Sequence, residues 1–201
     1  MAEIAVDVVL LPSEEMAAKA IEANKELLKQ CADKIVLDKE SCLPHISLAM
    51  GCIDERDIAD IEKILQAIAK QSSLGQLSAI GIHTGTNSTG EQVSVLQIER
   101  TEALQSLHEE VMRRLAPYFN HDVTADMVLS PPGASESTLA WIKSYSVKSS
   151  FEKFFPHITI GYGEINDYSF PIEFTASKLA LCHLGNHCTC RKILASVKLE
   201  S

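Results

Sequence analysis

The hydrophobic and polar positions of the chain follow two periods. Apolar residues recur every three or four positions, the spacing of one face of an α-helix, in residues 13–31, 54–68 and 101–115. In the first segment, Ser13 precedes two glutamates, and a hydroxyl cap followed by negative charge suits the amino end of a helix. We therefore expect three amphipathic helices, each able to cover one face of a sheet.

Short runs rich in β-branched residues, typical of strands, lie between these helices. Two connecting segments carry turn signals, Gly90 in the first and Gly185-Asn186 in the second, which predict hairpins. The expected fold class is α+β: a bilobal fold with two largely antiparallel sheets around a central cleft and helices outside. The expected strands are residues 4–11, 44–50, 77–83, 92–98, 156–162, 172–184 and 190–199, and a further helix is expected over residues 137–154.

A segment of eight residues occurs twice, 112 residues apart. The first copy, Pro44 to Gly51, reads PHISLAMG, and the second, Pro156 to Gly163, reads PHITIGYG. Four of the eight positions are identical and three more are conservative. Because both copies fall on expected strands, we expect residues 1–201 to form one bilobal domain in which each lobe supplies one copy.

Side chains two residues apart point to the same face of a strand. His45 and Ser47 therefore share one face of the first copy, and His157 and Thr159 share one face of the second. Small residues expected on the same faces would leave room for a phosphate; they are Ala49, Gly51, Gly161 and Gly163.

Two imidazoles, each with a hydroxyl two residues on, suit the hydrolysis of a cyclic phosphodiester. A neutral histidine can take a proton from water, and a protonated one can give a proton to the leaving ribose oxygen. This predicts His45 and His157 as the catalytic base and acid, in an order that the sequence leaves open. Ser47 and Thr159 would bind the phosphate by donating to its non-bridging oxygens. The chemistry requires no metal and no cofactor, and we expect none.

The sequences Pro-His-Ile-Ser and Pro-His-Ile-Thr resemble the twin His-x-Thr/Ser motifs of the two-histidine (2H) phosphoesterase superfamily. Within it, the chain resembles the 2′-5′ RNA ligase or RNA 2′,3′-cyclic phosphodiesterase family from the strand of residues 4–12 to the hairpin of residues 181–193. The resemblance implies pseudo-twofold symmetry, with one motif strand per lobe, and metal-independent chemistry on 2′,3′-cyclic phosphates or 2′-5′ linkages. It implies the same catalytic and phosphate-binding roles for the two histidines and the two hydroxyl residues.

The charge balance limits the partners. The chain has 18 Lys and Arg against 27 Asp and Glu, a net charge of -9, which is the wrong sign for holding long nucleic acid by counterion release. We therefore expect a cyclic nucleotide or an RNA terminus as partner, with no long nucleic-acid track. The amino terminus lacks the basic residues of a secretory signal, and no apolar run approaches the roughly 20 residues of a membrane helix. We expect a cytoplasmic monomer without membrane contacts.

The cysteines and histidines near the carboxyl end allow two interpretations. His and Cys residues within the nine residues from Cys182 to Cys190 suit a zinc site. The Gly185-Asn186 turn signal between two expected strands favours a hairpin tip instead. We expect reduced thiols, with Cys182 and Cys190 as small buried side chains across the hairpin, and no metal.

One aspartate and three histidines outside the repeated segment are further candidates for the site. Asp7, in the apolar run of residues 4–11, either points into the cleft to orient a histidine or lies on a partly solvated strand face, and we expect the second. His83 and His108 are expected to be structural, and His121 to be solvated.

Trp141 and Tyr145, four residues apart on an expected helix, are candidates for stacking a nucleobase. The alternative is that they form a core stripe. The loop of residues 120–136 is either a lid over the cleft or a surface connection.

The sequence thus predicts a metal-independent phosphodiesterase that opens 2′,3′-cyclic phosphates of nucleotides or RNA ends. The alternatives are a 2′-5′ RNA ligase running similar chemistry in reverse, and a non-catalytic nucleotide or RNA-end binding module whose histidines only hold phosphate. Turnover of a cyclic nucleotide distinguishes the first prediction from the last, and a 2′-5′ joined product identifies the ligase.

Overall fold

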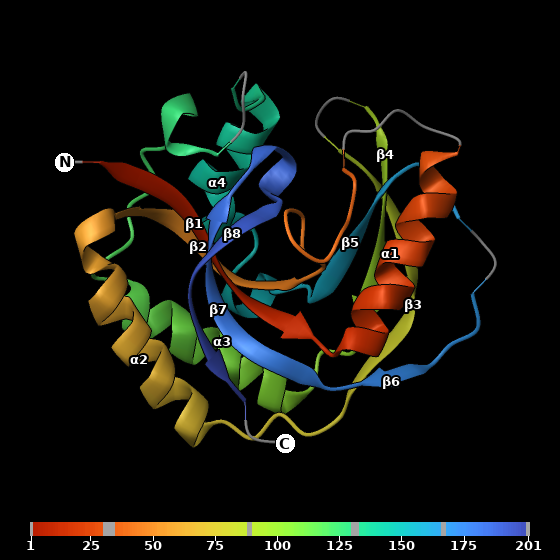
Figure 1. Ribbon diagram of the computed structural model, residues 1–201, viewed down its shortest axis with the longest axis horizontal. Coiled ribbons are helices and arrows are strands. Elements are labelled where there is room, and N and C mark those ends of the chain that lie inside the picture. Colours follow the sequence, from red (N-terminus) through yellow and green to blue (C-terminus); the bar gives the residue numbers. More distant parts are fainter. Residues whose placement is uncertain (1, 30–34, 88–89, 130–132, 166–167, 200–201) are drawn as a thin grey trace.

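The strands form one antiparallel sheet. The computed structural model describes residues 2–29, 35–87, 90–129, 133–165 and 168–199 (Figure 1). Within these residues the sheet has eight strands in the order β6-β3-β4-β5-β2-β1-β7-β8. The strands are β1 (Glu3–Pro12), β2 (Ile46–Asp54), β3 (Leu77–Thr86), β4 (Gln92–Ile98), β5 (His157–Tyr162), β6 (Ile172–Phe174), β7 (Ala176–Leu184) and β8 (Cys190–Lys198).

The sheet divides into two halves of four strands, which corrects the expectation of two separate sheets. The halves are β6-β3-β4-β5 and β2-β1-β7-β8. They are joined between β2 and β5 at a single paired position, Ile46 opposite Ile158. About this junction β2 corresponds to β5, β1 to β4 and β7 to β3. The bilobal α+β fold expected from the sequence is confirmed, with its two lobes continuous through the middle of one sheet.

Two helices cross from one half of the sheet to the other (Figure 1). The helix α1 follows β1 but packs against β5, and α3 follows β4 but packs against β2. Each half therefore covers the motif strand of the other. The described α-helices are α1 (Glu14–Leu28), α2 (Ile58–Gln71), α3 (Glu102–Leu115) and α4 (Glu136–Lys148), and the short 3-10 helices are η1 (Glu55–Asp57), η2 (Ala125–Met127), η3 (Phe151–Lys153) and η4 (Asn186–Cys188).

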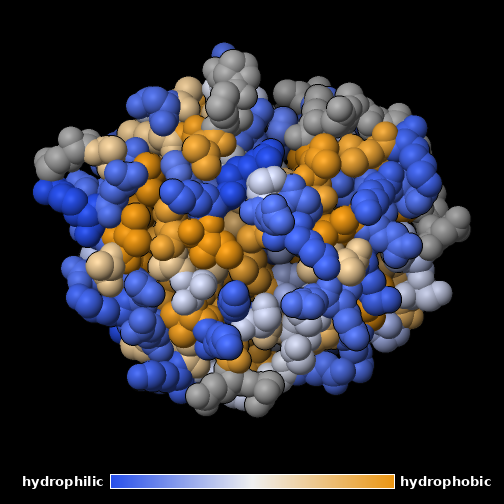
Figure 2. Space-filling view, viewed as in Figure 1, coloured by the Kyte–Doolittle hydropathy of each residue, from blue (hydrophilic) through white to orange (hydrophobic). Residues whose placement is uncertain are grey.

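The helices expected from the apolar periodicity are present, and side-chain caps explain where α1 and α3 begin. The Ser13 side chain accepts from the amide of Met16, and the Thr101 side chain accepts from the amide of Leu104. The core beneath the helices is mostly aliphatic, and Figure 2 shows apolar side chains gathered between α2 and the strands β7 and β8. No described helix has the length and the apolar composition needed to cross a membrane.

Two segments differ from the expected elements. Residues 172–184, expected as one strand, separate at Thr175 into β6, which pairs with β3, and β7, which pairs with β1. This segment therefore connects the two halves of the sheet, which the apolar pattern does not reveal. The helix expected over residues 137–154 ends at Lys148 and is followed by η3.

Candidate active site

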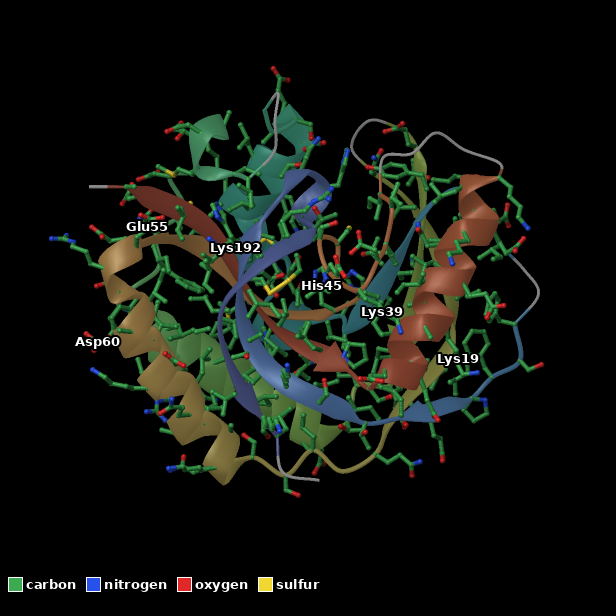
Figure 3. All side chains as sticks on the ribbon, viewed as in Figure 1. Lys19, Lys39, His45, Glu55, Asp60 and Lys192 are labelled. Atoms are coloured by element: carbon green, nitrogen blue, oxygen red, sulfur yellow. A yellow bond between two sulfur atoms is a disulfide. The ribbon has the colours of Figure 1, made fainter. Side chains whose placement is uncertain are left out.

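The two motif strands meet at the centre of the sheet. Ile46 of β2 lies opposite Ile158 of β5, and both side chains are buried. Continued by one residue in each direction, this antiparallel register places His45 opposite Thr159 and Ser47 opposite His157. The structure therefore brings the two imidazoles and the two hydroxyls to one face of the sheet, opposite the buried isoleucines. Figure 3 labels His45 near the middle of the molecule.

Hydrogen bonds fix both histidine rings in the same way. Nδ1 of His45 lies 2.7 Å from the carbonyl oxygen of Leu43, and Nδ1 of His157 lies 2.7 Å from that of Phe155. Since a carbonyl oxygen can only accept, each Nδ1 carries a proton and donates it. In the neutral ring Nε2 then keeps its lone pair, the atom that a general base uses.

Burial lowers the pKa of both histidines. For His45, hydrogen bonds to the backbone of Leu43 and Cys188 raise the pKa again, whereas the neighbouring His157 lowers it further. For His157, the backbone hydrogen bond raises the pKa and the nearby His83 lowers it. Because a charge on one ring disfavours a charge on the other, the pair opposes the state in which both imidazoles are protonated.

The two hydroxyls have different surroundings. Ser47 Oγ lies 2.6 Å from Oδ2 of Asp7 and hydrogen-bonds to it. The hydroxyl of Thr159 has no hydrogen-bond partner in the described part of the chain. The second hydroxyl is therefore available to a ligand, whereas the first already contacts a carboxyl group.

Asp7 is the residue that sequence reasoning placed wrongly. Its side chain is fully buried, with 0% exposure, and does not lie on a solvated strand face. Oδ2 also lies 3.9 Å from Nε2 of His45. Burial raises the pKa of this carboxyl well above its usual value, while hydrogen bonds from Ser47 and from the Ala49 backbone act in the opposite direction. The available sequence signal was that Asp7 is the only polar residue in its apolar run.

A β-bulge follows the hydroxyl residue in both motif strands. The register of β2 against β1 skips Leu48, and the register of β5 against β4 skips Ile160. An extra residue reverses the alternation of side chains beyond it. The two bulges are at equivalent positions, so the pseudo-twofold relation extends to this irregularity.

Three of the small residues beyond the bulges, Ala49, Gly51 and Gly161, pack within the protein, which corrects the expectation that they line the phosphate site. A Cβ atom on Gly161 would lie 3.0 Å from Nδ2 of Asn24 in α1, and one on Gly51 would lie 3.0 Å from the carbonyl oxygen of Asn120, after α3. Gly161 also has a φ angle of 135°, which favours glycine. Ala49 is buried in the core, and Gly163 follows the end of β5. Gly161 therefore leaves room for α1, and Gly51 for the segment after α3, rather than for a ligand.

Polar side chains of the two crossing helices hold the bulges. Asn24 of α1 donates to the carbonyl oxygen of Ile160 at 2.8 Å, and Nδ1 of His108 in α3 donates to that of Leu48 at 2.7 Å. Both side chains are fully buried. Nε2 of His108 accepts from the amide of Phe151 at 2.7 Å. His108 therefore connects the bulge in β2 to the segment that leads into β5.

Aromatic side chains lie on the His157 side of the site. The Phe155 ring is 42% exposed, and its centroid lies 5.4 Å from that of His157 and 5.6 Å from that of His83, which is exposed on β3. The candidate stacking residues separate: Trp141 is 44% exposed, whereas Tyr145 is only 4% exposed and packs in the core. Tyr145 therefore presents no ring face to a base.

The connection of residues 120–136 includes η2, and Asn120 at its start pairs with Cys52 of β2. Pro131 and Pro132, at the centre of this connection, lie outside the described residues. Its role as a lid stays a prediction.

Cys182 and Cys190 form a disulfide across the β7–β8 hairpin, where two separate thiols were expected (Figure 3). The hairpin brings their Cα atoms to 5.6 Å, within the range that a disulfide spans. The carbonyl oxygen of Cys190 accepts from the amide of Leu43 at 3.1 Å, so the hairpin also holds the residue that orients His45. Cys42, Cys52 and Cys188 are free, and Cys31 lies outside the described residues.

The histidines of this hairpin have separate hydrogen-bond partners. Nε2 of His183 lies 3.0 Å from the carbonyl oxygen of Met127, and Nδ1 of His187 lies 3.0 Å from the Tyr162 hydroxyl. The described segments contain no group of three or more His, Cys, Asp or Glu side chains that could hold a metal ion.

A comparison with protein families finds a match that includes both motif strands. The family model of the 2′-5′ RNA ligase superfamily matches residues 13–187, which include both of them. The chain belongs to this superfamily. Membership of the 2′-5′ RNA ligase superfamily confirms the resemblance to two-histidine phosphoesterases that the motifs indicated.

Two solved structures are similar in fold to this chain. The protein TT0787 of Thermus thermophilus has a TM-score of 0.59 and 16% identity over 98% of each chain. LigT of E. coli in its apo form has a TM-score of 0.50 and 14% identity over 100% of each chain. At these identities the likeness concerns the fold alone. No curated protein matches the sequence.

Proposed function

We propose that this protein hydrolyses 2′,3′-cyclic phosphates of nucleotides or RNA ends by general acid and base catalysis, without a metal ion. The observation that carries the proposal is the equivalent placement of His45 and His157. Each donates through Nδ1 to a backbone carbonyl and has Nε2 as its other ring nitrogen, on adjacent strands at the junction of the two lobes.

In the proposed reaction, the neutral histidine takes a proton from water at Nε2 while the water oxygen forms a bond to phosphorus. The bond from phosphorus to one ribose oxygen breaks, and the protonated histidine gives its Nε2 proton to that oxygen. One water is consumed, and the two histidines exchange protonation states. Ser47 and Thr159 are proposed to donate to the non-bridging phosphate oxygens, where negative charge is held in the transition state.

The substrate is proposed to be small or terminal, because the net charge of -9 opposes a long nucleic-acid track. The candidate rings for stacking a base are Trp141, which is exposed on α4, and Phe155, which precedes His157 by two residues. Phe155 lies nearer to the reacting groups because its ring contacts that of His157.

The test is hydrolysis of nucleoside 2′,3′-cyclic phosphates by the wild type, His45→Ala and His157→Ala. We expect each variant to lose about 10²- to 10⁴-fold in kcat/KM, the usual contribution of a general acid or base. His121→Ala, which removes a histidine of the connection after α3, is the matched control and should keep wild-type turnover. EDTA should leave the wild-type rate unchanged. Full activity in either site variant, or a strict need for added metal, contradicts the proposal.

A second candidate is RNA ligation, which the superfamily match favours. It would use the same groups in the same roles: the 5′-hydroxyl gives its proton to the neutral histidine as its oxygen bonds to phosphorus in place of water, and the ribose oxygen that leaves takes the proton of the other histidine. Incubation of one oligonucleotide with a 2′,3′-cyclic end and another with a 5′-hydroxyl tests it, and absence of any 2′-5′ joined product removes it. Tight binding of a cyclic nucleotide with neither hydrolysis nor joining would indicate a non-catalytic module instead.

A further inference from the structure

The two halves of the site have matching backbones but different chemistry at one position. Asp7 pairs with Met50 of β2, and Val93 pairs with Tyr162 of β5. Met50 and Tyr162 occupy the same place in the two copies of the repeated segment. The carboxyl of Asp7 therefore stands where the other half has the side chain of Val93, and only the first half has an acid behind its hydroxyl residue.

Apart from the hydrogen bonds from Ser47 and from the Ala49 backbone, the surroundings of Asp7 provide little to stabilise a negative charge. Its side chain has 0% exposure, and Oδ1 has no hydrogen-bond partner among the residues that the structure describes. His45 is its ion-pair partner among the described residues, at 3.9 Å from Nε2 to Oδ2, and no Lys or Arg of those residues pairs with it. The other titratable groups beside it are Tyr145 of α4 and Cys188 of η4, while Cys182 opposite it on β7 is in the disulfide.

A buried carboxylate with one oxygen unpaired is costly, and a neutral acid is the usual outcome. The distance of 2.6 Å between Ser47 Oγ and Asp7 Oδ2 fits a hydrogen bond between two oxygens, with the proton starting on either of them. If the carboxyl is neutral and donates to Ser47 Oγ, the hydroxyl hydrogen of Ser47 is free to point elsewhere. An ionised Asp7 would instead hold that hydrogen itself and repel an incoming phosphate.

We propose that Asp7 acts as a neutral carboxylic acid whose O–H group donates a hydrogen bond to Ser47 Oγ and thereby turns the Ser47 hydroxyl toward a phosphate oxygen of the ligand. This inference rests on the proposed function, because it assumes that the ligand phosphate lies between His45 and His157. Asp7 is a positioning residue, and its proton stays on the carboxyl throughout turnover. Thr159 needs no such partner because its hydroxyl is already free of protein contacts in the described part of the chain.

Infrared difference spectroscopy tests the protonation state without relying on activity. The wild-type spectrum minus that of Asp7→Asn, recorded near pH 7 with inorganic phosphate present, should contain the carbonyl stretch of a protonated carboxylic acid. The same difference for Glu3→Gln, at the exposed end of β1, should contain carboxylate bands only. Carboxylate bands alone in the Asp7 difference would overturn the proposal.

Substitutions test the effect on Ser47. Asparagine can donate to Ser47 Oγ as a neutral acid does, so Asp7→Asn should bind inorganic phosphate and turn over cyclic nucleotides within about threefold of the wild type. Asp7→Val, which copies Val93, should lose about tenfold or more in phosphate affinity, and Ser47→Ala should lose as much. The double variant should lose no more than either single one, because both act through the same hydroxyl.

The outcomes separate the two proposals. If Asp7→Asn falls as far as Asp7→Val while remaining folded, Asp7 acts as a carboxylate and this inference fails. If no protein turns over cyclic phosphates, the proposed function fails, yet the infrared and phosphate-binding results still decide the role of Asp7. Circular dichroism spectra that match the wild type establish that Asp7→Asn and Asp7→Val are folded.

Discussion

The Nδ1 bonds of His45 and His157 to the carbonyl two residues earlier determine what the rings can do. Because Nδ1 is occupied, Nε2 is the ring nitrogen that can take or give a proton. It lies on the face of the sheet that also carries the two hydroxyls. At the scale of single residues, the site is therefore defined by hydrogen-bond direction as much as by residue type. The two hydroxyls differ in this respect, and their replacement should show it.

Replacing Thr159 by valine should lower kcat/KM for a 2′,3′-cyclic nucleotide by about 10²-fold, because it removes one of the two proposed donors to the phosphate with little change in shape. Thr159→Ser should restore most of the activity, since the first half of the site uses serine at this place. Steady-state kinetics of the two variants provide the measurement. Equal rates for Thr159→Val and the wild type would show that this hydroxyl does not contact the reacting phosphate.

Asp7 should also make stability depend on pH. Because burial raises the pKa of the folded carboxyl well above its usual value of 3.8, the unfolded chain ionises first as pH rises. The wild type should therefore lose stability relative to Asp7→Asn as pH rises from about 4, by up to about 1.4 kcal/mol per pH unit. Urea unfolding of both proteins at several pH values between 4 and 7 measures this. A constant difference between them would mean that Asp7 ionises normally in the folded protein.

Residue patterns predicted that the two histidines and the two hydroxyls lie on one face of the motif strands, because the repeated segment preserves their spacing. They did not predict the position of Asp7. A single acid in an apolar strand is compatible with an exposed edge or with a buried site, and only the helix α4 and the hairpin tip around it decide between these. Burial by segments distant in the sequence cannot be predicted from local alternation.

At the scale of elements, the bulges at Leu48 and Ile160 shape the site. They turn Gly161 toward α1 and Gly51 toward the segment after α3, so that these segments can approach the motif strands. Strand alternation alone predicted those glycines on the ligand side, because a bulge has no local signature in these sequences. The same limit applies at Thr175, where one apolar run serves both halves of the sheet.

His108, which connects β2 to the segment before β5, should make the stability of the protein decrease in acid. Its pKa is lowered mainly by burial, and its Nε2 must be neutral to accept from Phe151. As pH falls through about 6.5, the unfolded chain takes up a proton first, so the folded state loses stability. His108→Gln can form both hydrogen bonds without titrating, and should lose less stability than the wild type between pH 7.5 and 5.5.

Urea unfolding of the two proteins at both pH values provides the measurement. His45 and His157 contribute the same slope to both proteins, so the difference reports on His108. His108→Ala, which forms neither hydrogen bond, should be less stable at both pH values by about 2 to 4 kcal/mol. Identical slopes for the wild type and His108→Gln would contradict the expected role.

At the scale of the whole molecule, two lobes share one sheet and exchange helices. Since α1 and α3 each cover the motif strand of the opposite lobe, we propose that residues 1–201 fold as one domain. The order of elements could be predicted from the sequence, because the helices and strands have clear periods. The exchange of helices could not be predicted, since it depends on how distant segments of the chain cross one another and not on any local pattern.

The acidic charge of the molecule should limit the length of RNA that it contacts. We expect an oligonucleotide of about ten residues with a 2′,3′-cyclic end to have nearly the same KM as a dinucleotide with that end. The logarithm of kcat/KM should fall with the logarithm of salt concentration with a slope of about -0.7 to -1.4, as for one or two phosphate contacts on a single strand. A steadily falling KM with length would indicate an extended track.

The difference between Asp7 and Val93 makes the two halves of the site unequal, so that a bound cyclic phosphate should prefer one orientation. In a pocket with full twofold symmetry, the five-membered phosphate ring would fit equally well in two orientations, and either ribose oxygen would leave. With a carboxyl group behind one hydroxyl and an apolar side chain behind the other, the two orientations have different energies. The product should consequently be a single positional isomer, with its phosphate on the same ribose carbon in every turnover.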